Sequence, residues 1–242
     1  MTRITNKINR LWKERALRKA AAPVLETPPI TPSDDGLVLF SMIGTKVILP
    51  YLVAVKSLHS RLRRGRVVIL DDGTLTAADR DVLDAHLGRP LVVSINDVDT
   101  GPCPRGGTWE RLLTLLDMRA SDYVIQLDSD TVTLWEVPDI AAAVAANRSF
   151  TLRGDRDSRL LSFNEMASMT EDDDFLYNPQ AHVQAAVECG LDRISLPMIA
   201  SPLYVRGCSG FAGFARGEGG RALAEAFSNR LRKKALALMW HC

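Results

Sequence analysis

The sequence predicts an α/β fold, in which a mostly parallel, Rossmann-like sheet is flanked by helices. Three observations carry this prediction. Short apolar runs recur along the chain, as expected for strands that are buried on both faces of a parallel sheet. Stretches of helical length separate these runs, which fits right-handed crossovers between neighbouring strands. Serine, aspartate or glycine follows several of the runs, at the strand ends where open α/β sheets bind their ligands.

Composition limits the class of protein. A chain of 242 residues can bury one substantial hydrophobic core. A hydrophobic content of 46% and a charged content of 24% are typical of a soluble globular protein. The formal net charge is only +1, so the chain has no overall positive field that would attract nucleic acid. We therefore expect no nucleic-acid partner.

Cysteine usage and hydropathy bear on the compartment. The four cysteines form no CxxC pair and no Cys/His cluster with zinc spacing, and we expect them to be reduced thiols: Cys103, Cys189, Cys208 and Cys242. No apolar run approaches 20 residues, and no apolar signal-peptide core follows the basic N-terminus. These features predict a cytoplasmic protein.

We expect three segments in the chain. Residues 1–20 combine seven basic side chains with an apolar stripe at helical spacing, formed by Ile4, Ile8, Leu11 and Trp12. This basic amphipathic helix could contact an anionic membrane peripherally, at its inner face; the alternative is a solvated arm or a helix docked on the body. Residues 21–36 are proline-rich and predict a linker, and residues 37–242 form the main α/β domain.

The first part of the domain alternates regularly. We expect strands over residues 37–40, 66–70, 91–95 and 123–127, with a helix over residues 49–62 after the first of them. Thr76 caps the next helix together with Asp79, and Gly88 ends it. A further helix begins near Trp109, with an apolar face formed by Trp109, Leu112, Leu113 and Leu116.

The pattern is looser after Asp130. Residues 139–147 predict a helix, and the polar, acidic residues 153–177 predict a long loop. Asn178-Pro179 is a typical helix start, with Gly190 as the stop. We expect short extended pieces over residues 204–214, followed by a final helix over residues 221–240 with Leu223, Phe227 and Leu231 on one side.

The candidate site is formed by the residues that follow three of the strands. Ser41, Asp71-Asp72 and Asp128-Ser129-Asp130 come after the first, second and fourth expected strands. Successive parallel strands end at the same edge of the sheet, so these groups can converge. The carboxylates of Asp128 and Asp130 suit Mn²⁺ or Mg²⁺, which in turn can bridge a diphosphate and stabilise it as a leaving group.

The order of elements up to Leu127-Asp128-Ser129-Asp130-Thr131 resembles the GT-A-type glycosyltransferases that use nucleotide sugars. Within them it is most similar to the glycogenin-like and lipopolysaccharide galactosyltransferase group, which has an LDxD motif, and the resemblance covers roughly residues 37–215. It implies a hexosyltransferase, retaining as in that group, that takes a nucleoside-diphosphate sugar as donor, with a UDP-sugar favoured. The acceptor hydroxyl stays open among carbohydrate, lipid and protein.

The resemblance also implies roles for single residues. Asp128 and Asp130 bind the metal, and Asp128 also contacts the donor. Arg111, on the helix before this strand, faces the diphosphate. Gly207–Gly213, with Gly210 at its centre, borders the donor sugar or the acceptor. Together with Ser41, Asp71 and Asp72 these residues form the expected nucleotide-sugar site.

Two features differ from that group. Its third metal ligand is often a histidine in an HxxGxxKPW-like segment, and only His241 occurs near that place. Either the chain stops short of the full C-terminus of the domain, or it belongs to another subfamily. No catalytic base is assigned; an inverting enzyme would need one, for which Asp173 and Asp174 are candidates.

Three other interpretations remain. Asp-Ser-Asp after a strand can be plain turn chemistry. Asp128 to Val132 also fits the nucleophile motif DxDx(T/V) of haloacid dehalogenase-type phosphatases, but those need a downstream lysine, and none occurs between Lys56 and Lys233. The chain could also be a catalytically inactive binding module with a nucleotide-sugar fold.

Overall fold

The computed structural model describes residues 12–13, 15–106, 108–153, 158–169, 183–196 and 199–239. Contacts divide the chain into two compact units. The first contains Met1–Val98, Met118–Thr151 and Ser209–Gly217, and the second contains Asp99–Asp117, Leu152–Cys208 and Glu218–Cys242. The expected catalytic domain over residues 37–242 thus comprises most of one unit and the whole of another, which sequence periodicity alone does not reveal.

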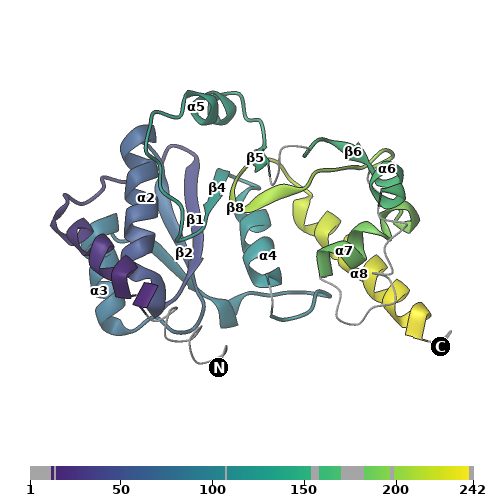
Figure 1. Ribbon diagram of the computed structural model, residues 1–242, viewed down its shortest axis with the longest axis horizontal. Coiled ribbons are helices and arrows are strands. Elements are labelled where there is room, and N and C mark those ends of the chain that lie inside the picture. The colour runs from purple at the N-terminus through teal and green to yellow at the C-terminus, as the bar shows by residue number, and fades with distance from the viewer. Residues whose placement is uncertain are drawn as a thin grey trace. The chain divides into compact units, whose positions relative to one another are not determined.

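A six-stranded, mostly parallel sheet confirms the predicted α/β fold (Figure 1). Its order is β3-β2-β1-β4-β8-β5, in which β1 pairs in parallel with β2 and β4, β2 pairs in parallel with β3, and β8 runs antiparallel to β4. The strands are β1 (Leu37–Ile43), β2 (Arg66–Asp71), β3 (Leu91–Ser94), β4 (Tyr123–Leu127), β5 (Phe150–Arg153) and β8 (Gly207–Phe214).

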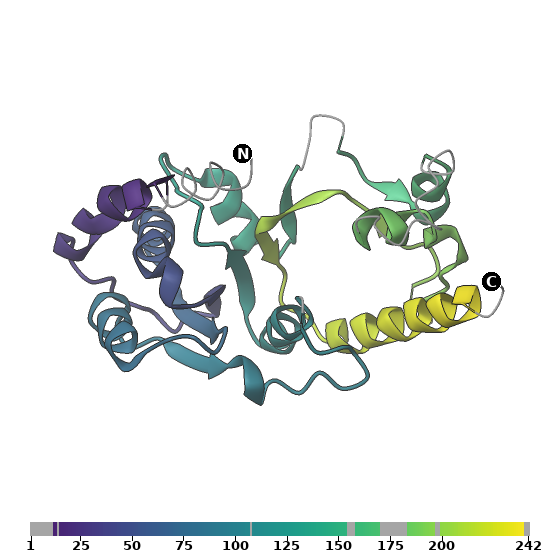
Figure 2. The same ribbon diagram turned by 60° about the horizontal axis from the view of Figure 1, so that its bottom comes forward.

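The crossover helices of the first unit begin and end close to the predicted residues (Figure 2). They are α2 (Ile48–Leu62), α3 (Ala77–Leu87) and α5 (Pro138–Ala145), with short 3-10 turns at Ala22–Glu26, Thr45–Val47 and Ile95–Asp97. The predicted capping box is present, because Thr76 Oγ1 accepts from Asp79 N and Asp79 Oδ2 accepts from Thr76 N. Gly88 ends α3 in the left-handed conformation, with φ 69°.

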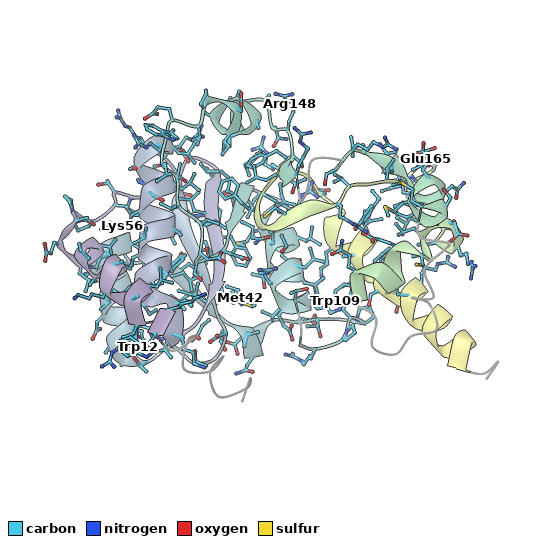
Figure 3. All side chains as sticks on the ribbon, in the orientation of Figure 1. Trp12, Met42, Lys56, Trp109, Arg148 and Glu165 are labelled. Atoms are coloured by element: carbon cyan, nitrogen blue, oxygen red, sulfur yellow. The ribbon has the colours of Figure 1, made fainter. Side chains whose placement is uncertain are left out.

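The segment that the sequence predicts to be a linker, residues 21–36, is packed against the main core. Residues 15–21 are helical, and Trp12, labelled in Figure 3, is 69% exposed. The proline-rich segment that follows buries Val24 and Ile30 in the main core. Residues 1–11 and 14 lie outside the described part, so the membrane-contacting helix stays a prediction. Within the described residues, no helix combines the length and the apolar character needed to cross a membrane.

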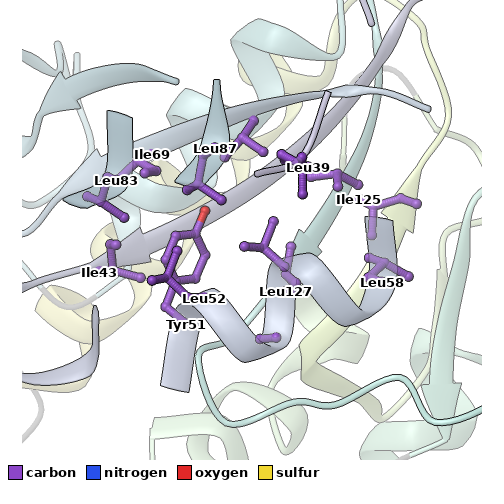
Figure 4. Close-up of a cluster of buried hydrophobic side chains, with 14 of the residues drawn as sticks. Leu39, Ile43, Tyr51, Leu52, Leu58, Ile69, Leu83, Leu87, Ile125 and Leu127 are labelled. Atoms are coloured by element: carbon purple, nitrogen blue, oxygen red, sulfur yellow. The ribbon is translucent and has the colours of Figure 1, made fainter. Parts of the chain in front are cut away.

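The main core lies between the sheet and α2 and α3. Alternate residues of the central strands point into it, among them Leu39, Ile69 and Ile125. They meet fully buried side chains of the helices, such as Leu52 and Leu83 (Figure 4). The intervening strand residues are buried as well, which is why these strands are continuous apolar runs in the sequence.

The second unit contains short elements and one long helix. They are α4 (Trp109–Met118, up to Asp117 in this unit), β6 (Leu161–Ser162), α6 (Phe163–Ser168), α7 (Val183–Glu188), a 3-10 turn (Leu191–Arg193), β7 (Leu203–Tyr204) and α8 (Gly220–Met239). As predicted, α8 directs Leu223, Phe227 and Leu231 to one side, where they pack around Met166 and Leu191.

The long loop predicted over residues 153–177 is wrong in part, because β6 and α6 lie within it. Ser162 and Glu165 form a reciprocal capping box that starts α6. This Ser-x-x-Glu spacing is visible in the sequence and is the signal that the interpretation as a loop overlooked. The expected helix start at Asn178-Pro179 lies outside the described residues.

A buried carboxylate links the short elements of the second unit. The Glu188 side chain is fully buried; its Oε1 accepts from Tyr204 Oη at 2.6 Å and from Arg206 Nε at 3.0 Å, and its Oε2 accepts from an Arg206 terminal nitrogen at 2.5 Å. Burial raises the pKa of Glu188, but the bonds from Arg206, Tyr204 and Gln184 outweigh it and hold the pKa below its ordinary value of 4.5. We therefore expect Glu188 to be ionised at neutral pH.

Candidate active site

The carboxyl edge of the parallel strands gathers the predicted polar residues within the first unit. Because β2, β1 and β4 are neighbours and parallel, their carboxyl ends lie at one edge of the sheet. The turns that leave this edge contain Gly44, Asp71-Asp72 and Asp128–Asp130. In the part of β8 that belongs to the same unit, Gly210 reaches this edge beside β4.

Backbone hydrogen bonds fix the Asp-Ser-Asp turn at both ends. Asp128 N donates to Gly210 O at 2.8 Å, which continues the β4–β8 pairing by one residue. Thr131 closes the turn, since its N and its Oγ1 donate to Asp128 O at 3.3 and 2.9 Å. Asp128 is half-buried and Asp130 is exposed. The turn thus presents two carboxylates, one residue apart, from a backbone that the sheet holds in place.

Gln126 positions Asp128, and the sequence interpretation missed it. This buried side chain uses its amide nitrogen to donate to Ser209 O at 2.6 Å and to Asp128 Oδ1 at 3.2 Å. It thereby connects β8, β4 and the first carboxylate of the motif. A single polar residue within the apolar run Tyr123–Leu127 is the signal that could have identified it, since a buried amide needs a hydrogen-bond partner.

The donor set fits a hard divalent cation whose coordination is completed by the substrate. Mg²⁺ in proteins is typically held by one or two carboxylates together with substrate phosphates and water. Asp128 and Asp130 supply two carboxylates of this kind. Among the described residues, no group of three or more histidine, cysteine, aspartate and glutamate side chains could hold a metal. His241, Asp173 and Asp174 lie outside the described residues.

Asp71 holds a loop together, in place of the ligand contact that we expect from the sequence. It is 4% exposed, and its Oδ1 accepts from Gly73 N at 2.8 Å and from Leu75 N at 3.2 Å. Its Oδ2 forms an ion pair with Arg80 at 2.6 Å. Both oxygens are therefore engaged within the protein. The sequence shows neither this turn nor the arginine one turn into the following helix that reaches back to it.

Asp72 remains a candidate for nucleotide contact. It is exposed, and its backbone N donates to Ile43 O at 2.9 Å, which attaches this loop to the end of β1. Its Oδ1 accepts from Thr74 N at 3.0 Å and from Thr74 Oγ1 at 2.6 Å. Thr74 Oγ1 in turn accepts from Thr45 N at 3.1 Å, so the loops after β1 and β2 support each other.

Ser41 is not at the end of its strand. β1 continues to Ile43, and the two-residue repeat turns Ser41 toward the face that α2 covers. The side chain is fully buried, and its hydroxyl donates to Leu127 O at 2.7 Å. The predicted ligand contact is therefore replaced by a bond that joins β1 to the last residue of β4. The sequence placed the strand end at Phe40, three residues too early.

Arg111 belongs to the second unit. It lies half-buried in the first turn of α4, beside Glu110, whose Oε1 accepts from Gly106 N at 2.7 Å. The site described above is built from residues of the first unit alone, so the diphosphate contact of Arg111 stays a prediction.

Similarity searches give solved structures only: no protein-family model and no curated protein matches the chain. Mouse xyloside xylosyltransferase 1, in its apo form, is similar with a TM-score of 0.44 and 12% identity, over 84% of this chain and 76% of that one. Core-mannan synthase A from Aspergillus fumigatus, in an Mn/GDP form, is similar with a TM-score of 0.44 and 8% identity, over 85% and 68%. A likeness at this level transfers no substrate, cofactor or site residue.

Gly44 sets the position of Asp72, and we predict that Gly44→Ala displaces it. A β-carbon at Gly44 would overlap the carboxylate of Asp72 and the hydroxyl of Thr74. The two exposed side chains must move apart, and the loss of their mutual hydrogen bond costs about 0.5–1.5 kcal/mol. Chemical denaturation measures this loss. The Gly44→Ala/Asp72→Ala double variant lacks the carboxylate with which the new β-carbon would clash. If its loss in the free energy of unfolding equals the sum of the losses in the two single variants, a steric cause is contradicted.

Proposed function

We propose that this chain is a glycosyltransferase that moves a sugar from a nucleoside-diphosphate sugar to an acceptor hydroxyl. One observation carries the proposal: Asp128 and Asp130 form a turn that is held by β8 and Gln126 at the carboxyl edge of a parallel sheet. This is the edge at which open α/β sheets bind nucleotides. The order of strands and helices before the turn is the feature on which the resemblance to GT-A-type glycosyltransferases rests.

Each residue of the site has a place in this function. Asp128 and Asp130 would hold Mn²⁺ or Mg²⁺, which when bound neutralises charge on the donor diphosphate. Gln126 donates to Asp128 Oδ1 and so keeps that carboxylate oriented. Asp72, exposed directly after β2, would accept hydrogen bonds from the ribose or the base. Arg111 would add positive charge near the diphosphate, as the resemblance implies.

The reaction follows from these positions. The bond between the anomeric carbon and the diphosphate oxygen breaks, and the electron pair leaves with the nucleoside diphosphate. The anomeric carbon becomes oxocarbenium-like, the acceptor hydroxyl oxygen forms the new bond, and its proton is released. The protein contributes chiefly by orienting the donor against the acceptor and by stabilising negative charge on the leaving group. We favour a UDP-sugar and a retaining outcome, as in the group that the chain resembles.

A binding module is the second candidate, favoured by a specific observation. The described residues hold no third metal-ligating side chain beside Asp128 and Asp130. A site with two carboxylates could bind a metal-nucleotide complex without organising the transfer step. Such a module would bind nucleoside diphosphates but turn over no donor.

Donor turnover separates these functions. The full chain, incubated with nucleotide sugars and Mn²⁺, is expected to release nucleoside diphosphate by transfer or by slow donor hydrolysis. Metal-dependent binding of the same nucleotide sugars without any release would favour the binding module. Release of phosphate from simple phosphomonoesters would instead favour the phosphatase that shares the DxD pattern.

A further inference from the structure

A cavity lies in the first unit, between α2 and the N-terminal segment formed by residues 20–31. Its volume is about 710 Å³, within the range of roughly 300–1,000 Å³ that is usual for small-molecule sites. Most of its lining surface is apolar and comes from prolines, alanines and valines of both walls. None of the lining residues belongs to the Asp-Ser-Asp site, and none is acidic.

One wall is a stripe on α2. Val53, Lys56, Ser57 and Ser60 recur at intervals of three and four residues, so they share a face of the helix. Figure 3 labels Lys56 on this helix. The opposite wall is the proline-rich segment, in which Pro23, Pro28 and Pro29 restrict the backbone.

Hydrogen bonds hold the two walls in place. Lys56 Nζ donates to Thr27 O at 3.2 Å and so spans the cavity wall from α2 to the proline-rich segment. Ile30 N donates to His86 O at 3.0 Å, which fastens the same segment to the last turn of α3. Thr27 Oγ1 donates to Val24 O at 2.6 Å and closes the turn between them. The cavity is therefore preformed rather than opened by a ligand.

The polar lining of the cavity is basic. His59 belongs to the wall, because it is 8% exposed, its Nε2 has almost no accessible surface, and its ring is hydrogen-bonded to the backbone of Thr31. Of the three Lys56 ammonium donors, two are used by Thr27 O and by His86 Nδ1, the latter at 3.2 Å. Arg63 adds a further positive charge to the lining.

We propose that this cavity binds a small carboxylic acid with an apolar tail. One carboxylate oxygen accepts from the remaining Lys56 donor, and the positive charge of the exposed Arg63 adds to the attraction. The alkyl tail lies against Val24, Val53 and the prolines. A charge-assisted bond to an ammonium favours an acid over a neutral alcohol, and the basic, acid-free lining excludes an amine. The site is separate from the proposed transferase site and does not depend on it.

Isothermal titration of the full chain with decanoate, below its micellar concentration, tests the proposal. We expect one saturable site for decanoate, with decan-1-ol and decylammonium each at least about tenfold weaker. Ala20→Trp, at an exposed position of the lining, is expected to weaken decanoate by at least about tenfold. Ala22→Trp is the matched control, because Ala22 is exposed nearby but does not line the cavity, and it should leave the affinity unchanged.

A further variant tests the headgroup contact. Lys56→Met keeps an unbranched side chain in the wall but removes the ammonium group, and we expect decanoate to lose its advantage over decan-1-ol. The absence of decanoate binding, equal binding of decylammonium, or an unchanged affinity in Ala20→Trp would each overturn the proposal. Thermal unfolding of every variant shows that it is folded. If Lys56→Met does not fold, the Ala20→Trp and Ala22→Trp variants and the three ligands still decide between the outcomes.

Discussion

Asp128→Ala and Asp130→Ala are each expected to abolish metal-dependent binding of nucleoside diphosphates. In the proposed site the two carboxylates would hold the metal, and the metal would in turn neutralise charge on the diphosphate. We expect affinity in the presence of Mn²⁺ to fall by at least about 100-fold, or ~2.7 kcal/mol. Thermal shift with and without nucleotide measures this, because a ligand at 100 times its Kd stabilises by about 2.7 kcal/mol.

The controls separate loss of the site from loss of the fold. Asp84 is an exposed aspartate in the last turn of α3, at the end of the helix away from the loop that contains Asp72, and Asp84→Ala should bind as the unmodified chain does. Without nucleotide, Asp130→Ala should unfold at an unchanged temperature, since Asp130 is exposed. Unchanged Mn²⁺-dependent affinity in both motif variants would refute the assignment of these carboxylates.

Arg206→Met is expected to cost the largest amount of stability, about 3 kcal/mol. Removing the arginine leaves Glu188 as a fully buried carboxylate without its cation, and an unpaired buried charge typically costs about 3–5 kcal/mol. We expect the lower end of that range because Tyr204 and Gln184 still donate to Glu188. Arg193→Met is the matched control: its pair with Asp192 is exposed, so its loss should cost less than about 1 kcal/mol.

The pH dependence of this loss has a definite sign. In the unmodified chain the pKa of Glu188 lies below 4.5, so the ionised carboxylate stabilises the fold at neutral pH, and this stability is lost as the pH falls through the folded pKa. In Arg206→Met, burial raises the pKa of Glu188 with less opposition. The difference between the two chains should therefore shrink as the pH falls from neutral toward the folded pKa of Glu188 in the unmodified chain, below 4.5, as denaturation at several pH values can measure. Glu188→Gln should rescue Arg206→Met in part; a double variant with the summed losses would contradict the coupling.

Preferences of single residues and of their neighbours in the sequence account for most of the fold features that the sequence predicts. Apolar runs identify β1, β2 and β4 because strands buried on both faces have few polar positions, and buried ones such as Ser41 and Gln126 need a hydrogen-bond partner inside the protein. Thr76 and Gly88 bound α3 through caps that depend only on neighbouring residues. These features need no knowledge of distant contacts, so a single sequence suffices for them.

Contacts between distant residues explain what the sequence does not predict. Ser41 and Asp71 are polar residues near strand ends, which is a sound signal for a ligand site, but their partners are Leu127 and Arg80. Whether a carboxylate faces a substrate or an arginine depends on how the chain packs. The proline-rich composition that predicts a linker likewise gives no sign that Val24 is buried in the core.

The metal dependence of nucleoside-diphosphate binding tests the central claim most directly. Isothermal titration of the unmodified chain with UDP and GDP, once with Mn²⁺ and once with a chelator, isolates the role of the metal. If Asp128 and Asp130 hold a cation that bridges the diphosphate, at least one of the two nucleotides binds with Mn²⁺ and its binding is lost with the chelator. Binding of equal affinity in both conditions, or no binding in either, would contradict the proposed site.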